Sequence, residues 1–325
     1  MSAYLTRRLI YAILILIGVN LLTFTLFFFV NSPDDMARIH LGVKRVTPDA
    51  IAKWKEERGY DKPLIYNGAA AGVKRLTDTI FFEKSAKLFA FRFGRSDDGR
   101  DIGFDIRTRM WPSLAIAIPV FVVGLLIYIT FALLMAFVRA TAVDFWGVVL
   151  CVVMMSISSM FYIIGGQYLV SKLWSLVPIS GYDTGIDAFK FLILPVIVGL
   201  MSGFGESGRF YRTLFLEEIN KDYVRTARAK GLSEIRVLFR HVLQNAMIPI
   251  LTGVVAKIPL LFIGSLITEA FFGIPGLGSY TIDAIRSQDF AIVRSMVFLG
   301  SALYILGLVM TDISYTLVDP RVKFE

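Results

Sequence analysis

The sequence predicts an all-α protein that crosses a membrane several times. Of its 325 residues 56% are hydrophobic, and the mean hydropathy is +0.65, whereas soluble domains contain roughly 45–50% apolar residues. The apolar residues occur in blocks long enough to cross a hydrocarbon layer about 30 Å thick. The formal net charge is +8, but the basic residues gather beside these blocks. That placement indicates an orientation signal for membrane insertion and argues against nucleic-acid binding.

Windows of about 19 residues predict the spans. They give six membrane-spanning helices, near residues 9–30, 112–138, 145–170, 189–207, 243–268 and 292–317. The apolar block of segment 1–30 is longer than a signal-peptide core of about 7–15 residues and lacks a small-x-small cleavage site, so we expect it to remain as a helix. Residues 31–109 are polar and predict a small extramembrane insert, with a helix starting at Thr47-Pro48-Asp49. The remaining core, 110–325, holds the other five helices.

Basic residues in the short loops predict the orientation, because long loops translocate largely regardless of charge. Arg7, Arg8 and Arg139 flank the first two spans on one side. The connection 208–242, on the same side if there are six spans, adds Arg209, Arg212, Lys221, Arg225, Arg228, Lys230, Arg236 and Arg240. The opposite short connections carry only Lys172 and Arg286. We therefore expect both termini and the basic loop in the cytoplasm, and the insert outside.

The basic loop contains a short helix, expected over residues 221–230. Asn220 is its predicted N-cap, Gly231 is placed to end it in a left-handed conformation, and Ser233 can start a second helix. At about 100° per residue the basic side chains fall on one side and the less polar ones on another; these sets are Lys221, Arg225 and Arg228, and Tyr223, Val224 and Ala227. The pattern leaves two interpretations open, a helix lying on anionic lipid and a helix docked on a partner protein.

The later spans contain residues that are unusual at membrane depth. Pro249 and Pro259 interrupt the fifth span and free backbone carbonyls, and Lys257 lies between them. A charge there is costly against lipid, so Lys257 should face water, a carboxylate or a freed carbonyl, and structural pairing and solute contact both remain open. Together with Glu269 these three residues mark a candidate translocation path. Gly199 and Gly203 predict close helix packing in the fourth span.

Several stretches of the chain carry motifs of a known family. The loop reads DYVRTARAKGLS over 222–233 and continues with His241 and NAMIP over 245–249. The chain starts YLTRRL over 4–9, has EAFFGIPGLG over 269–278 and ends in DISYTLVDPR over 312–321. In these stretches it resembles the dipeptide, oligopeptide and nickel permease family of ABC importers. The resemblance is strong from about 190 to 321 and at the first span, and weak through 31–109 and about 140–185.

This resemblance implies a type I ABC importer transmembrane domain with six helices in the bacterial inner membrane. It further implies a second homologous permease, two ABC ATPase subunits and an extracytoplasmic solute-binding protein as partners. The short loop helix would be the coupling helix that docks on an ATPase, with Asn220, Lys221, Tyr223, Arg225, Ala227, Arg228, Ala229, Lys230 and Gly231 as its coupling residues. Ala227 and Ala229 would be small enough for close approach. Members of the family carry peptides, nickel, opines or oligosaccharides.

The sequence offers little material for catalysis. It has no Gly-x-x-x-x-Gly-Lys-Ser/Thr run, so we expect no nucleotide site in this chain, and ATP and Mg would bind the partner ATPases. Its two histidines, His40 and His241, lie in different regions, and Cys151 is its one cysteine, so we expect neither an enzyme nor a metal site. A single-chain cation-coupled transporter, with Lys257 and Glu206 as coupling groups, is the alternative. It would predict an inverted repeat of spans, and none is visible. A structural subunit of a membrane complex is a third possibility.

Overall fold

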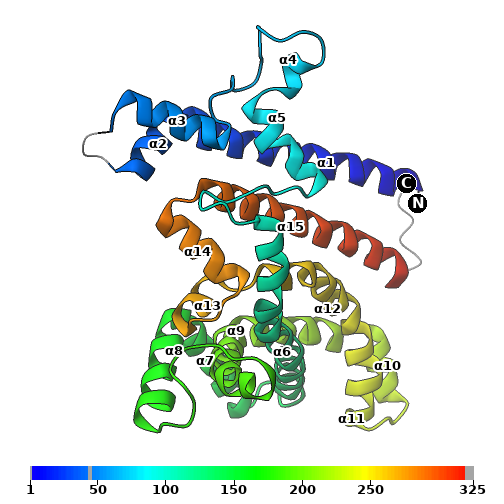
Figure 1. Cartoon of the computed structure of the whole chain (residues 1–325). Helices are drawn as coiled ribbons and strands as arrows, with labels where there is room; N and C mark the ends of the chain where they lie inside the picture. The colour runs from blue at the N-terminus through cyan, green and yellow to red at the C-terminus, as the bar shows by residue number, and fades with distance from the viewer. Residues whose placement is uncertain (1, 43–45, 319–325) are drawn as a thin grey trace. The chain divides into compact units, whose positions relative to one another are not determined.

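The computed structural model describes residues 2–42 and 46–318, and helices make up most of them (Figure 1). Within these ranges the only β-pairing is an isolated bridge between Arg95 and Asp101. The all-α prediction is therefore confirmed. Residues 319–321 of the carboxyl-terminal motif lie outside the described part of the chain.

Helices long and apolar enough to cross a membrane occur at five places in the described residues. They are Thr6–Val30, Ile102–Phe137, Gly185–Ile219, Glu234–Ile263 and Phe290–Ser314. A sixth candidate is the bent pair Ala142–Ser156 and Ser159–Leu173. The chain is thus a multi-pass membrane protein, with five spans or, if the bent pair is one span, six.

The expected third span, 145–170, is not one straight helix. The helices α7 (Ala142–Ser156) and α8 (Ser159–Gly166), the latter extended by a π-helical turn to Leu173, meet at 86°. Ile157 and Ser158 are extended at the break, and the Ser158 side chain accepts a hydrogen bond from the Met160 backbone N–H. A serine that caps a new helix competes with continuation of the old one, which explains the break.

The expected fifth span, 243–268, is shifted towards the N-terminus. Short α11 (Glu234–Val237), a π-helical segment (Leu238–Leu243), α12 (Gln244–Lys257) and a 3₁₀ turn (Pro259–Ile263) form one span. Gly264 ends it with φ +74°, and Ser265 caps the separate helix α13 (Leu266–Phe272). Hydropathy could not place this boundary because both sides of the glycine are apolar.

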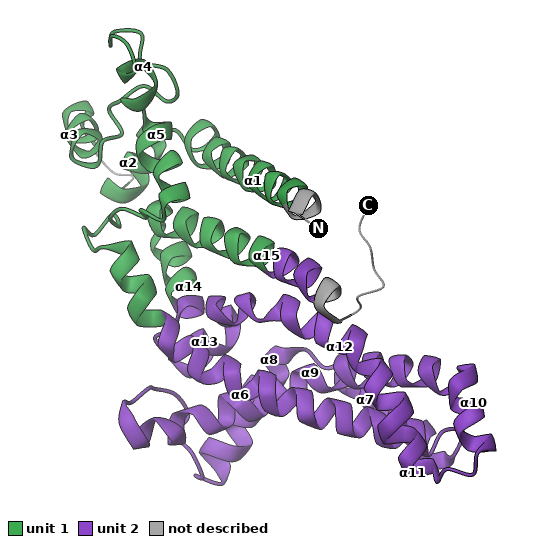
Figure 2. Ribbon diagram, turned by 90° about the vertical axis from the view of Figure 1, so that its right-hand side faces the viewer, with its two compact units in different colours: residues 1–109, 280–306, 325 green, residues 110–279, 307–324 purple. Residues whose placement is uncertain are grey.

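One compact unit comprises residues 1–109 and 280–306 (Figure 2). It contains α1 (Ser2–Thr25) with a π-helical end (Leu26–Val30), α2 (Pro33–Leu41), α3 (Pro48–Arg58), α4 (Lys74–Thr77), α5 (Ile80–Lys84), a 3₁₀ turn (Ala86–Ala90), the start of α6 (Ile102–Phe137), most of α14 (Leu277–Ser287) and the first part of α15 (Phe290–Val318). Thr47 caps α3 through the Ala50 N–H, as predicted. The aromatic core joins Phe24 and Phe28 to Trp54 and Tyr60, so the insert packs on the first span.

Charged groups hold the insert's loops together. The Lys62 ammonium lies 2.7 Å from Glu83 and 2.9 Å from Asp78. Hydrogen bonds to Glu83 and then to Asp78 raise the pKa of Lys62 to about 12, since they favour its charged form. The backbone N–H of Asp97 donates to Asp289 at the start of α15. The insert is thereby tied to the last span within this unit.

The second unit comprises residues 110–279 and 307–324. It contains the rest of α6, the bent pair, α9 (Ala188–Ile219), α10 (Asp222–Ala229) and the elements from α11 to α13. Glycines allow α9 close approach: a Cβ at Gly199 would lie 2.8 Å from Val120 of α6, which confirms the packing expected there. The Arg212 guanidinium binds both oxygens of the buried Asp144, at 2.8 and 2.7 Å, and so joins α9 to α7.

Candidate functional site

The loop helix α10 is shorter than expected. Its N-cap position is Lys221, without a side-chain cap, and not Asn220 as predicted. Asn220 keeps helical backbone angles at the end of α9 (φ −88°, ψ −4°). Its amide donates to the Leu216 carbonyl and accepts from Arg139. Because those contacts occupy the Asn220 side chain, the residue closes α9 instead of opening α10.

The C-terminal end of α10 is formed as predicted. Gly231 has φ +78°, and its N–H donates to the Arg228 carbonyl at 2.9 Å. A Cβ on Gly231 would meet nothing within 4 Å, so the need for glycine is conformational and not one of space. Beyond the bend, the Arg228 guanidinium binds both Glu234 oxygens, at 2.8 and 3.1 Å. This bidentate ion pair links α10 to α11 across the bend.

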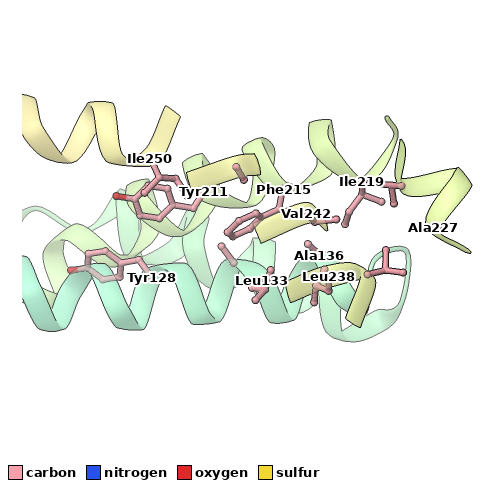
Figure 3. Packing of buried hydrophobic residues seen from close by; sticks show 14 residues of the cluster. Tyr128, Leu133, Ala136, Tyr211, Phe215, Ile219, Ala227, Leu238, Val242 and Ile250 are labelled. Carbon is pink, nitrogen blue, oxygen red and sulfur yellow. The ribbon is translucent and has the colours of Figure 1, made fainter. Parts of the chain in front are cut away.

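The inner face of α10 is part of the core of the second unit. Val224 is fully buried and Ala227 is 4% exposed. Both belong to a cluster that joins α6, α9, α10 and the start of the fifth span (Figure 3); its members include Leu133, Ala136, Phe215, Ile219, Leu238, Val242 and Ile250. Ala227 therefore does not offer the contact surface expected of it. Its small side chain allows α10 to approach the protein's own spans.

The outer face of α10 is open and mainly cationic. The exposed residues of α10 and its two flanking positions are Lys221, Asp222, Tyr223, Arg225, Thr226, Ala229 and Lys230, three cations against one anion. The Tyr223 hydroxyl donates to Glu218, and burial together with this neighbouring carboxylate raises the pKa of Tyr223. Arg225 lies 3.4 Å from Asp222, an exposed pair that contributes little to stability. The site thus presents free positive charge on a helix whose opposite face is fixed in the core.

Glu269 lies at the centre of a second site, in α13 outside the spans. Its side chain is fully buried. One carboxylate oxygen accepts from the Ser265 N–H and the other from the Ser279 N–H, both at 3.1 Å, and the Ser113 hydroxyl and Gly278 N–H also donate to it. Burial raises the pKa of Glu269, and these hydrogen bonds oppose that rise. The carboxylate is thus the common acceptor for the 264–279 segment.

Small residues make room for this carboxylate. A Cβ on Gly264 or Gly276 would collide with it, and a Cβ on Gly278 would lie 2.6 Å from the Ser265 carbonyl carbon. The Ser113 hydroxyl also accepts from the Leu277 N–H at 2.8 Å, which ties α6 to the segment. Ser113 was not predicted as a site residue, because a lone serine in an apolar span carries no distinctive pattern.

A cavity of about 340 Å³ opens beside Glu269. Its lining combines apolar side chains of α6 and the fifth span with Ser113, Pro195, Gly199, Ser202, Ser265, Thr268 and Glu269. Of the four residues expected to mark a translocation path, only Glu269 lines this cavity. Pro249 is inside α12, Pro259 is buried at the start of the 3₁₀ turn, and Lys257 is exposed at the end of α12. The structure therefore does not gather the four around one cavity.

Comparison with known proteins gives the family. The family described as "Binding-protein-dependent transport system inner membrane component" matches residues 113–324, and its N-terminal counterpart matches residues 1–83. The chain is 30% identical to the di/tripeptide transport system permease protein DppB of Pseudomonas aeruginosa (strain UCBPP-PA14), over the full length of both. It is 29% identical to the dipeptide transport system permease protein DppB of Escherichia coli (strain K12), again over both full lengths. The chain belongs to the inner-membrane permease components of binding-protein-dependent ABC importers.

Proposed function

We propose that this chain, together with a second homologous permease, forms the path by which an ATP-driven importer carries di- or oligopeptides across the inner membrane. The observation that carries the proposal is the α10 site, a short helix with one face fixed among the spans and a free cationic face. The names of the similar proteins, which are permeases for dipeptides and di/tripeptides, support peptides as the solute. Two ABC ATPases and an extracytoplasmic binding protein complete the proposed complex.

In this proposal the chain changes conformation during transport, and the partner subunits hydrolyse ATP. ATP and Mg bind the partner ATPases, whose closure pushes on the outer face of α10. Because Val224 and Ala227 pack in the same cluster as residues of α6, α9 and the fifth span, a displacement of α10 reaches those helices without first bending a loop. Close-packed interiors transmit such displacements well.

Purification and ATPase measurement test this function together. The chain is solubilised gently, the co-purifying subunits are identified by mass spectrometry, and ATP hydrolysis is measured with the binding protein and a peptide library. We expect a second permease, two ATPases and hydrolysis stimulated by short peptides. Stimulation by nickel, opines or oligosaccharides instead would correct the solute, and a complex without any ATPase would refute the importer.

We also propose that both termini and α10 face the cytoplasm and that residues 31–109 face outward, as the loop charges favour. Single cysteines introduced in a Cys151→Ala background, at Tyr66 in the insert and at Lys230 beside α10, test this orientation with an impermeant thiol reagent. Both positions are exposed. Position 66 should react in intact cells and position 230 only after permeabilisation. The reverse result would invert the topology.

Substitutions of two alanines in α10 distinguish docking on the ATPase from packing of the helix on the spans. We expect Ala229→Glu, on the exposed face, to weaken ATPase binding and uptake while the permease stays folded. Ala227→Glu should instead destabilise the permease by several kcal/mol, because it buries an unpaired charge among apolar side chains. Thermal unfolding of the purified chain and ATPase co-purification distinguish the two effects. Equal unfolding temperatures for both variants would show that this face of α10 does not pack on the spans.

A further inference from the structure

The helix α9 has two exposed faces of opposite character. One face is apolar, with exposed fractions of 67% for Phe189, 47% for Ile193, 43% for Ile197 and 40% for Met201. The other is polar, with Ser202, Glu206, Arg209 and Thr213 at steps of four, three and four residues, of which the last three are exposed. Such steps place side chains on one side of a helix. Lipid suits the apolar face, so the polar face requires a different neighbour.

The polar face of α9 lies on the same side of the helix as the residues that line the cavity beside Glu269. Pro195, Gly199 and Ser202 line that cavity from the same helix. Glu206 follows Pro195 by eleven residues, about three turns, and so lies on the same side. Glu206 thus lies one turn beyond Ser202, the last residue of α9 in the cavity lining, and inside a candidate span, Gly185–Ile219.

The level of Lys257 relative to α9 follows from the residues on either side of it in the fifth span. Leu261 lines the same cavity as Gly199 and Ser202, while Ile250 and Tyr211 belong to the same buried cluster, shown in Figure 3. The two helices are therefore antiparallel, and Lys257, between Ile250 and Leu261, falls near the level of residues 203–206 of α9. The positive charge of Lys257 is therefore at about the same depth as the negative charge of Glu206.

Neither charge is paired within the described part of the chain. Glu206 and Lys257 are both exposed, and neither forms an ion pair or a side-chain hydrogen bond with any residue in the described ranges. Unpaired charges within spans are costly against lipid and are found facing water-filled cavities or charged partners. A solute that carries one ammonium and one carboxylate complements this arrangement at both ends.

We propose that the polar face of α9 and Lys257 line the water-filled solute path, and that Glu206 and Lys257 bind the amino and carboxyl termini of a zwitterionic peptide. This inference rests on the proposed function and deepens it, because it assigns a charge pattern to the solute. A carboxylate of the second permease is the other partner that Lys257 could have, and the test separates the two.

The test uses the complete transporter in proteoliposomes, with its binding protein and a dipeptide. Cys151 is the one native cysteine, so Glu206→Cys and Lys257→Cys are made in a Cys151→Ala background, with Ile197→Cys on the apolar face as the matched control. Charged methanethiosulfonate reagents should modify positions 206 and 257 but not 197. Uptake should fall about tenfold or more in both variants, the loss expected for a charged hydrogen bond. It should return with the anionic reagent at 206 and with the cationic reagent at 257, and dipeptide should slow both modifications.

Two results would overturn the inference. Cysteines at 206 and 257 that no charged reagent reaches would show that neither residue lines a water-filled path. Modification that dipeptide does not slow would show water but no solute at this level. Failure of the wild-type complex to take up any peptide would instead count against the proposed function.

Discussion

Replacing Gly231 by valine should abolish uptake while the protein still inserts at normal levels. Gly231 has φ +78°, a conformation that costs an L-residue roughly 1–2 kcal/mol and a β-branched residue more. A valine would relax towards negative φ and turn α10 away from its cluster. The bidentate ion pair between Arg228 and Glu234, which spans this bend, would then be lost.

Gly231→Asn is the matched control, because asparagine tolerates the left-handed region better than other residues with a side chain. The space around the site is open, so the size of the side chain is not the difference between the two variants. We expect Gly231→Asn to keep most of the uptake and Gly231→Val to lose at least about tenfold, a factor that corresponds to about 1.4 kcal/mol. Uptake and peptide-stimulated ATP hydrolysis are the measurements. Normal coupling in the valine variant would show that the bend at Gly231 is not needed.

Replacing Glu269 by alanine should destabilise the 264–279 segment more than any exposed substitution in the chain. The change leaves the Ser265, Gly278 and Ser279 N–H groups and the Ser113 hydroxyl without their common acceptor. Each buried donor left unpaired costs about 1–3 kcal/mol. We therefore expect a lower unfolding temperature and faster proteolysis within this segment.

Glu269→Gln should have an intermediate effect, because one oxygen remains an acceptor while the new NH₂ group faces an N–H donor. Glu217→Ala, at an exposed position near the C-terminal end of α9, provides the control for loss of a carboxylate. Thermal unfolding and limited proteolysis of the purified complex should rank the proteins as wild type, then glutamine, then alanine. An alanine variant as stable as the wild type would show that the four donors find other acceptors and that Glu269 does not organise the segment.

Local patterns predicted much of the fold and the glycine bend that follows α10. Hydropathy located the spans but not the break in the third or the end of the fifth. The start of α3 followed from Thr47-Pro48 and the left-handed end of α10 from Gly231, because each depends on a few neighbouring residues. The N-cap was misplaced by one residue, since the Asn220 side chain binds Leu216 and Arg139. Arg139 is far away in the sequence, and no local pattern reports such a contact.

By itself, the sequence determined that this protein is an all-α, multi-pass membrane protein with a short basic helix between two spans. Only the tertiary structure decided which face of each helix is covered. Periodicity assigned Val224 and Ala227 to one face of α10, but the cluster shows that this face packs on the spans. Likewise Glu269 is enclosed by donors from three segments, and Glu206 is left open on α9. The reason is geometric: a step of 100° per residue fixes the angles between side chains on one helix, whereas burial depends on segments that only folding brings together.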